Sequence, residues 1–155
     1  MIYLKPGGAN MHIQYPVGQG GLHFGYNDAV QYIYDCGGLG DKINWTAIFD
    51  EINRCINPEL PLKIYISHFH DDHCNKLHDL LNLIPDHIKI EFYYPRITTI
   101  EKLILLSEYL FDRGDKSFAH ILDQYDEFIN YYSLVVDTEQ TITAFHRNTS
   151  FNILG

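Results

Sequence analysis

Residues 68–73 read His68-Phe69-His70-Asp71-Asp72-His73 and directly follow Lys63-Ile64-Tyr65-Ile66-Ser67, a run whose composition predicts a strand. In an extended segment His68 and His70 point to one side, and Asp72 and His73 follow where the chain turns into a helix. Imidazole nitrogens and carboxylate oxygens are ligands that divalent metals such as zinc accept, and open sites use about three of them per metal. The spacing therefore predicts half of a dinuclear metal site, with these four residues as ligands.

The alternative is a solvated loop in which several of the nine histidines cluster by chance. Two glycine-rich segments nearer the N-terminus argue against it. Residues 32–38, Tyr-Ile-Tyr-Asp-Cys-Gly-Gly, predict a strand that ends in Asp35 and a glycine turn. Residues 17–21, Val-Gly-Gln-Gly-Gly, predict a second glycine turn between strands.

Together these segments resemble the metallo-β-lactamase fold superfamily. The four ligand candidates match that family's signature motif residue for residue, and Asp35 matches the Asp that supports the ligands from beneath. The glycine turns are also similar to those of the hydrolase domain of ComEC-type DNA-uptake proteins, over roughly the first 85 residues. The resemblance implies the N-terminal half of an αββα sandwich: an α/β fold with one mixed sheet and outer helices.

Members of this family continue to a further His, a Gly-Asp strand end whose carboxylate bridges two metals, and a final His. Here no Asp, Glu or His follows His146. We expect residues 141–154 to form a strand, a turn bearing His146 and the start of another strand, similar to the family's third motif. This makes His146 the candidate for the missing ligand of the first metal; the alternative is a solvent-facing His at a strand end. We expect residues 1–155 to form one partial domain that requires a missing C-terminal half, a partner chain or a second copy.

The composition is that of one soluble domain, with 46% hydrophobic residues among 155. Three widely spaced cysteines, Cys36, Cys55 and Cys74, argue against a secreted disulfide framework. No signal peptide and no apolar run of membrane-spanning length is present, so we expect a cytoplasmic protein without a membrane partner. The net charge of −9 excludes a basic stripe for duplex DNA, although divalent metals would attract phosphate locally.

Hydrophobic periodicity predicts an alternation of strands and helices. The expected strands are Met11–Val17, Leu22–Tyr26 and Ala29–Asp35, all antiparallel, followed by Leu62–Ser67 and Lys89–Tyr94, and the expected helices are Lys42–Ile56 and Asn75–Ile84. One face of this sheet would lack a cover. We expect that open face to carry apolar residues such as Ile33, Ile64 and Ile66.

Residues 98–132 predict a helical hairpin insertion. Thr98-x-x-Glu101 is a capping box, and Arg113-Gly114 closes the first helix. The second helix carries an apolar stripe: Phe118, Ile121, Leu122, Tyr125, Phe128, Ile129 and Tyr132. Such a stripe is first a core signature, and a lid over the site or a partner contact is the alternative.

The function that follows is hydrolysis by a metal-activated water, with phosphodiester or nucleic-acid substrates preferred because of the ComEC-like turns. Up to two ions are expected, zinc first and manganese second. Asp72 would bind metal and orient the water, and Asp35 would hold the imidazoles in place by hydrogen bonds. The alternative is a non-catalytic metal-binding or scaffold module within a larger complex.

Overall fold

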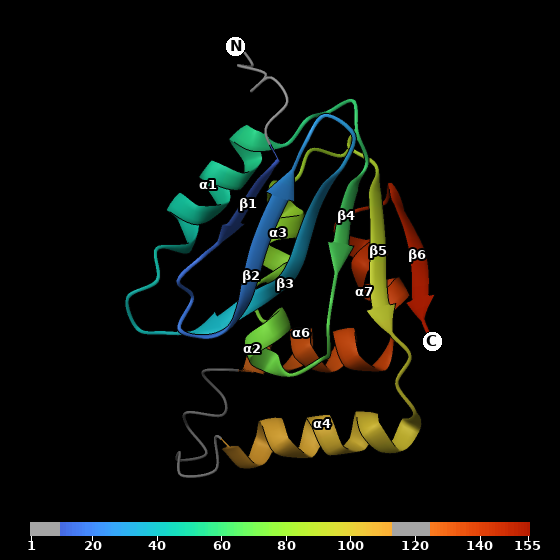
Figure 1. Cartoon of the computed structure of the whole chain (residues 1–155). Helices are drawn as coiled ribbons and strands as arrows, with labels where there is room; N and C mark the ends of the chain where they lie inside the picture. The colour runs from blue at the N-terminus through green and yellow to red at the C-terminus, as the bar shows by residue number, and fades with distance from the viewer. Residues whose placement is uncertain (1–9, 113–124) are drawn as a thin grey trace.

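A six-stranded sheet with the order β1-β2-β3-β4-β5-β6 forms the centre of the structure, a computed structural model that describes residues 10–112 and 125–155 (Figure 1). The strands are β1 (Met11–Gln14), β2 (Gln19–Tyr26), β3 (Gln31–Leu39), β4 (Leu62–Tyr65), β5 (Ile90–Pro95) and β6 (Thr149–Leu154). The first three pair antiparallel, and β3 through β6 run parallel. The chain is therefore an α/β protein with one mixed sheet, as the sequence predicts.

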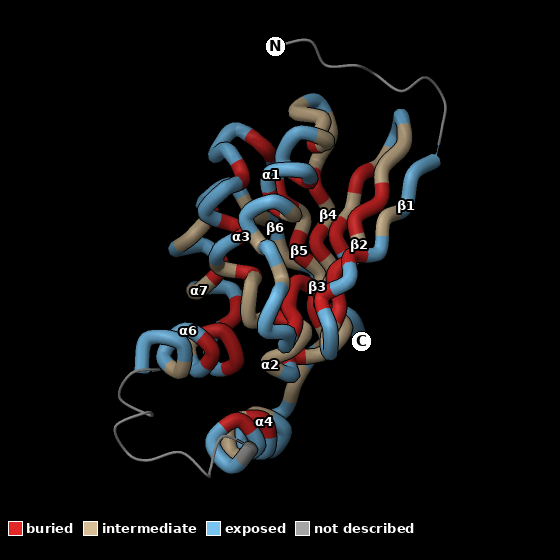
Figure 2. The backbone as a smooth tube through the Cα atoms, turned by 90° about the vertical axis from the view of Figure 1, so that its left-hand side faces the viewer, coloured by how far each residue is buried: buried red, intermediate tan, exposed pale blue. Residues whose placement is uncertain are grey.

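The helices lie on one face of the sheet and at one end of it (Figures 1 and 2). Helices α1 (Trp45–Cys55), α3 (Leu77–Leu83) and α7 (Thr138–Phe145) cover one face. Helices α2 (Asp71–Cys74), α4 (Thr99–Asp112) and α6 (Tyr125–Val136) lie at the end where the parallel strands finish. Within the described residues no helix is long and apolar enough to cross a bilayer.

Buried and half-buried side chains alternate along β4 and β5, and this pattern shows which face of the sheet the helices cover. Leu62 and Ile64 are fully buried against the helices, whereas Lys63 and Tyr65 are half-buried on the opposite face. The open face carries aromatic and charged side chains rather than aliphatic ones. On this face Tyr65 stacks on Tyr93 with ring centroids 4.5 Å apart. The expectation that Ile33, Ile64 and Ile66 would lack a cover was wrong, since all three have no exposed surface. The helices bury the isoleucines, and the face without helices carries tyrosines.

The strands and helices expected before residue 96 are found with shifted ends. The helix expected at Asn75–Ile84 is α3 (Leu77–Leu83), and the separate short helix α2 (Asp71–Cys74) precedes it. The strand expected at residues 141–145 was wrong, because this segment belongs to helix α7. Asp137 caps α7 by accepting a hydrogen bond from the backbone N–H of Gln140 at 3.2 Å. Ile142 is fully buried, so the core favours the helix over the strand propensity of the threonines.

The hairpin expected over residues 98–132 is described in part. The capping box is confirmed, since a carboxylate oxygen of Glu101 accepts from the backbone N–H and hydroxyl of Thr98 at 2.6 and 2.7 Å. Residues 113–124, which include Arg113, Gly114, Phe118, Ile121 and Leu122, lie outside the described residues. In the rest of the stripe Phe128 is partly buried against the core, as expected, whereas the prediction was wrong for Tyr125, Ile129 and Tyr132, which are exposed. Helix α6 buries Tyr131, Leu134 and Val135.

Candidate metal centre

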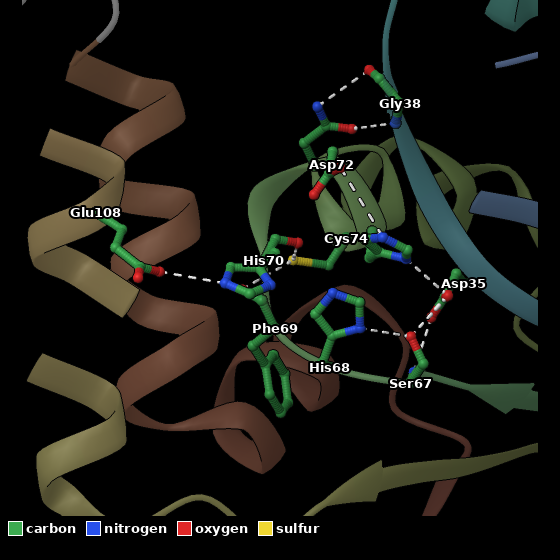
Figure 3. Close-up of polar contacts among 11 residues, drawn as sticks. Asp35, Gly38, Ser67, His68, Phe69, His70, Asp72, Cys74 and Glu108 are labelled. Carbon is green, nitrogen blue, oxygen red and sulfur yellow. Dashed lines mark hydrogen bonds and ion pairs between the residues drawn. The ribbon is translucent and has the colours of Figure 1, made fainter. Parts of the chain in front are cut away.

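The motif follows β4 directly, so its side chains lie at the carboxyl end of the parallel strands, where ligands bind in open α/β sheets. His68 and His73 have ring centroids 4.0 Å apart, and His68 and His70 have ring centroids 4.8 Å apart (Figure 3). Phe69 is 1% exposed and fixes the loop to the core. The structure therefore brings the three motif histidines together.

Asp35 lies beneath this cluster because of a β-bulge. Leu22 pairs with Cys36 and His23 pairs with Tyr34, which leaves Asp35 without a cross-strand partner. Its backbone has φ of 56°, a left-handed conformation that Asp tolerates better than most residues. A bulge re-aims a side chain, and here the 3% exposed carboxylate points to the motif.

The carboxylate of Asp35 accepts three hydrogen bonds from the motif. They come from the backbone N–H of Ser67 at 2.7 Å, from the Ser67 hydroxyl at 2.7 Å and from Nδ1–H of His73 at 2.8 Å. An ionised carboxylate only accepts, so the proton of His73 lies on Nδ1 and Nε2 keeps its lone pair. This is how carboxylates orient metal-binding histidines.

Ser67 sets the position of the proton on His68 in the same way. Its hydroxyl has one proton and donates it to Asp35, so Ser67 must accept the hydrogen bond that joins it to Nδ1 of His68 at 2.8 Å. Nε2 of His68 is then unprotonated as well. Burial lowers the pKa of His68, with smaller contributions from His73 and His70, which favours the neutral ring that a metal requires.

Glycines of β2 and β3 allow the backbone of α2 to approach the sheet. A Cβ at Gly20, where φ is 127°, would overlap the carbonyl oxygen of Asp72. A Cβ at Gly37 would lie 2.6 Å from the same oxygen. Asn75 adds a second link, because its side-chain amide pairs with the backbone N–H and C=O of Gly38 at 3.1 and 3.3 Å. Gly20, Gly37 and Gly38 were expected in turns but lie within β2 and β3, where they allow the ligand helix to pack closely on the sheet.

Two carboxylates near the motif each lie beside one histidine. Oδ2 of Asp72 lies 3.9 Å from Nε2 of His73, and Oε2 of Glu108 lies 3.2 Å from Nε2 of His70. Among residues 10–112 and 125–155 no three His, Cys, Asp or Glu side chains form a group that could hold a metal ion in the arrangement described. A metal would therefore require ring rotations to gather the donors.

A cavity of about 880 Å³ opens in front of the motif, a size suited to a small-molecule group. Helices α4 and α6 form one of its walls with Leu105, Glu108, Tyr109, Glu127 and Tyr131. The hydroxyl of Tyr131 donates to the carbonyl of Phe69 at 2.7 Å. Burial of the Tyr131 side chain raises its pKa above the ordinary value. The hairpin is thus tied to the motif loop.

His146 lies elsewhere. It precedes β6, and β6 starts beside Ile90 at the amino end of the parallel strands, opposite the motif. Its ring is fully buried, with Nδ1 3.3 Å from the hydroxyl of Thr149 and Nε2 3.4 Å from the carbonyl oxygen of Pro85. The structure therefore does not bring His146 to the other candidate ligands.

Four residues of the site were not predicted as such: Ser67, Asn75, Glu108 and Tyr131. Ser67 is adjacent to His68, so the sequence held a signal for it in a hydroxyl that directly precedes the first ligand. Glu108 and Tyr131 reach the site through tertiary packing, and no local pattern marks them. Cys74 is buried with its Sγ 3.3 Å from the carbonyl oxygen of His70, as expected of a small residue packed at the helix start.

No protein-family model matches this chain, and no curated protein matches it either. The fold and site define an α/β protein with a histidine and carboxylate cluster at the carboxyl end of its parallel strands.

Proposed function

We propose that this chain is a metal-dependent hydrolase, or the metal-bearing half of one, whose metal is held by His68, His70, Asp72 and His73. The observation that carries the proposal is the Asp35 network, which keeps the protons of His68 and His73 on Nδ1 and leaves both Nε2 atoms as lone-pair donors. Burial of a carboxylate to 3% exposure is costly, and the three hydrogen bonds from Ser67 and His73 offset this cost only while they hold those groups in place. Support of metal ligands is the role that we propose for this network.

Zinc fits this donor set first and manganese second, and a complete site would hold up to two ions. A divalent metal there supplies a Lewis acid that lowers the pKa of water and polarises the substrate oxygen. Asp72 orients the attacking water and also contributes a donor oxygen. Asp35 holds a proton at Nδ1 of His73, and Phe69 keeps the loop from moving away from the cavity.

Phosphodiesters, including nucleic acids, are the substrate class we propose, on the strength of the ComEC-like turns. The cavity lining carries five carboxylates and one Lys: Asp41, Asp71, Asp72, Glu108 and Glu127 with Lys76. An anionic substrate would be repelled by this lining, so its binding would depend on the charge of the metal. We expect phosphodiester binding to be lost on metal removal.

We also propose that the sheet is the N-terminal half of a metallo-β-lactamase-type sandwich, completed by a C-terminal half, a partner chain or a second copy. The open face supports this, because Tyr34 is 43% exposed on a sheet whose opposite face is covered by helices. For residues 1–155 by themselves, we expect the Asp72 and His73 position to bind metal weakly and turnover to be slow. Two tightly bound metals per monomeric chain would contradict this.

The alternative function is a non-catalytic metal-binding or scaffold module. It is favoured by one observation, namely that the described residues hold no converged group of three donors. A module of this kind would bind metal for stability and would not hydrolyse any phosphodiester in an Asp72-dependent manner.

Elemental analysis tests the proposal. We expect the double variant His68→Ala, His70→Ala to lose the metal that the wild type carries. The matched control is His12→Ala, His23→Ala, since these rings also stack, at 5.4 Å, but on β1 and β2. Equal metal in the wild type and the motif variant would refute metal binding by the motif. Hydrolysis of bis(p-nitrophenyl) phosphate with zinc or manganese, compared with Asp72→Ala, then separates the hydrolase from the scaffold.

A further inference from the structure

Glu108 of helix α4 faces His70 across the cavity, with Oε2 3.2 Å from Nε2 of the ring (Figure 3). We propose that Glu108 is a metal ligand of this site, supplied by the helical hairpin and paired with His70. This inference rests on the proposed function, because it assumes that the motif binds a metal. It changes the role of the hairpin from a lid or a packing element to a part of the metal centre.

The distance between the two donor atoms supports a shared metal. Zinc–nitrogen and zinc–oxygen bonds of about 2.0–2.2 Å at a tetrahedral angle separate two ligand atoms by about 3.3 Å. The 3.2 Å between Glu108 and His70 matches this spacing, whereas the 3.9 Å between Asp72 and Nε2 of His73 is longer. Glu108 and His70 are therefore the pair that is already spaced for one metal.

The ring of His70 also differs from its neighbours in what it contacts. His68 and His73 each place Nδ1 on a partner beneath the site, Ser67 or Asp35, which leaves Nε2 for a metal. The Nε2 atom of His70 points the other way, toward Glu108. A metal bound at this nitrogen would need a further donor on the hairpin side of the cavity. Two carboxylates line that side, Glu108 and Glu127, and Glu108 is the one that lies 3.2 Å from Nε2 of His70.

Packing of the neighbouring residue holds the backbone of α4 beside the cavity, although the side chains of Glu108 and His70 are themselves about half exposed. Tyr109, the next residue, stacks on Tyr131 with ring centroids 4.6 Å apart and planes 17° apart. Tyr131 in turn donates its hydroxyl proton to the carbonyl of Phe69, which lies between His68 and His70 in the chain. The backbone beside Glu108 is thus linked to the motif loop through the buried side chains of Tyr109 and Tyr131, which keeps the carboxylate within reach of His70.

The first experiment measures the zinc affinity of the full chain by competition with a chromophoric chelator. Glu108→Gln retains the size of the side chain and its ability to accept a hydrogen bond from His70, but amides are poor zinc ligands. We expect this variant to bind zinc about 100-fold more weakly than the wild type. Thermal unfolding in the presence of a chelator shows whether the variant is folded.

The second experiment reports direct coordination. In Glu108→Cys loaded with cobalt(II), a thiolate bound to the metal produces an intense charge-transfer band in the near ultraviolet. Ser107→Cys places a thiol at the adjacent position, outside the cavity lining, and the wild type controls for Cys36, Cys55 and Cys74. We expect the band in Glu108→Cys and in neither control.

The outcomes are distinguishable. A wild type that binds neither zinc nor cobalt refutes the proposed function itself. A wild type that binds metal, with Glu108→Gln equal to it, overturns the assignment of Glu108 and leaves the proposed function standing. Weakened binding by Glu108→Gln without a band in Glu108→Cys means that Glu108 only positions His70, and this also overturns the assignment. A charge-transfer band in the wild type would mean that a native cysteine binds the metal. The assignment of Glu108 then stands only if Glu108→Gln lowers the zinc affinity and Glu108→Cys makes the band stronger; otherwise it is overturned.

Discussion

Replacement of Asp35 by Asn should reverse the proton arrangement of the motif. An amide carries only one acceptor oxygen, and the backbone N–H of Ser67 can donate but not accept, so that oxygen stays with Ser67. The NH₂ group then faces the Ser67 hydroxyl and Nδ1 of His73. His73 must move its proton to Nε2, and Ser67 now donates to Nδ1 of His68, which moves its proton likewise. Both Nε2 donors are lost.

The magnitude follows from the three hydrogen bonds to the carboxylate at 2.7, 2.7 and 2.8 Å. Loss of the supporting carboxylate should weaken zinc binding by about 10- to 100-fold, or about 1.4–2.7 kcal/mol. The free energy of unfolding of the metal-free chain should fall by about 1–3 kcal/mol, because hydrogen bonds to a buried charge are replaced by neutral ones. Asn is preferred to Ala as the replacement, since it tolerates the φ of 56° at this position.

Zinc competition and urea denaturation with chelator measure the two quantities separately. Asp50→Asn is the matched control, because Asp50 is exposed on α1 and far along the chain from the motif. If Asp35→Asn loses stability but binds zinc within about twofold of the wild type, the network holds the loop and does not set the protons of the histidines. The reasoning behind the proposed function would then be refuted.

Three further substitutions test the surroundings of the site. Tyr131→Phe removes the buried hydrogen bond to the carbonyl of Phe69, so the urea midpoint should fall by an amount equivalent to about 1–2 kcal/mol; an unchanged midpoint would contradict the bond. Gly20→Ala would push a Cβ into the carbonyl oxygen of Asp72, and both stability, by about 1–3 kcal/mol, and zinc affinity should fall. Burial lowers the pKa of His78 below 6.5, so the unfolded chain takes up its proton first and the free energy of unfolding decreases as the pH falls below 6.5. His78→Gln should flatten that pH dependence as the pH falls through 6.5, and an identical slope would exclude His78 as its source.

The local part of this site could be predicted from sequence because its residues are adjacent along the chain. Three histidines fall within six residues, and a turn into a helix directly after the strand brings them together at the carboxyl end of the parallel strands. Asp35 was predicted from the resemblance, and the bulge that aims it at His73 was not. A bulge depends on the pairing of two strands, so a single strand sequence does not reveal it.

The errors have a common physical origin in tertiary packing. Threonines at 138, 141 and 143 favour a strand, but the Asp137 cap and the burial of Ile142 make the segment a helix. The same error led to the expectation that His146 would lie beside the motif. The sequence of β3 and β4 shows that their isoleucines lie on the same face of the sheet. Which of the two faces is covered by the helices depends on the handedness of the crossover connections, and this caused the error.

Strand direction explains which residues can take part in the site at all. Because β3, β4 and β5 are parallel, segments that follow them meet at one edge of the sheet. Asp35 lies in the middle of β3, directly after the residues of β3 that pair with β4. The three histidines follow β4, and α4 with Glu108 follows β5. His146 precedes its strand, and the six residues of β6 span about 20 Å, so no side-chain rotation carries His146 to the motif. Further ligands of this centre must therefore come from segments that lie at this end of the sheet, or from another chain that reaches it, and Glu108 satisfies this condition within the described residues.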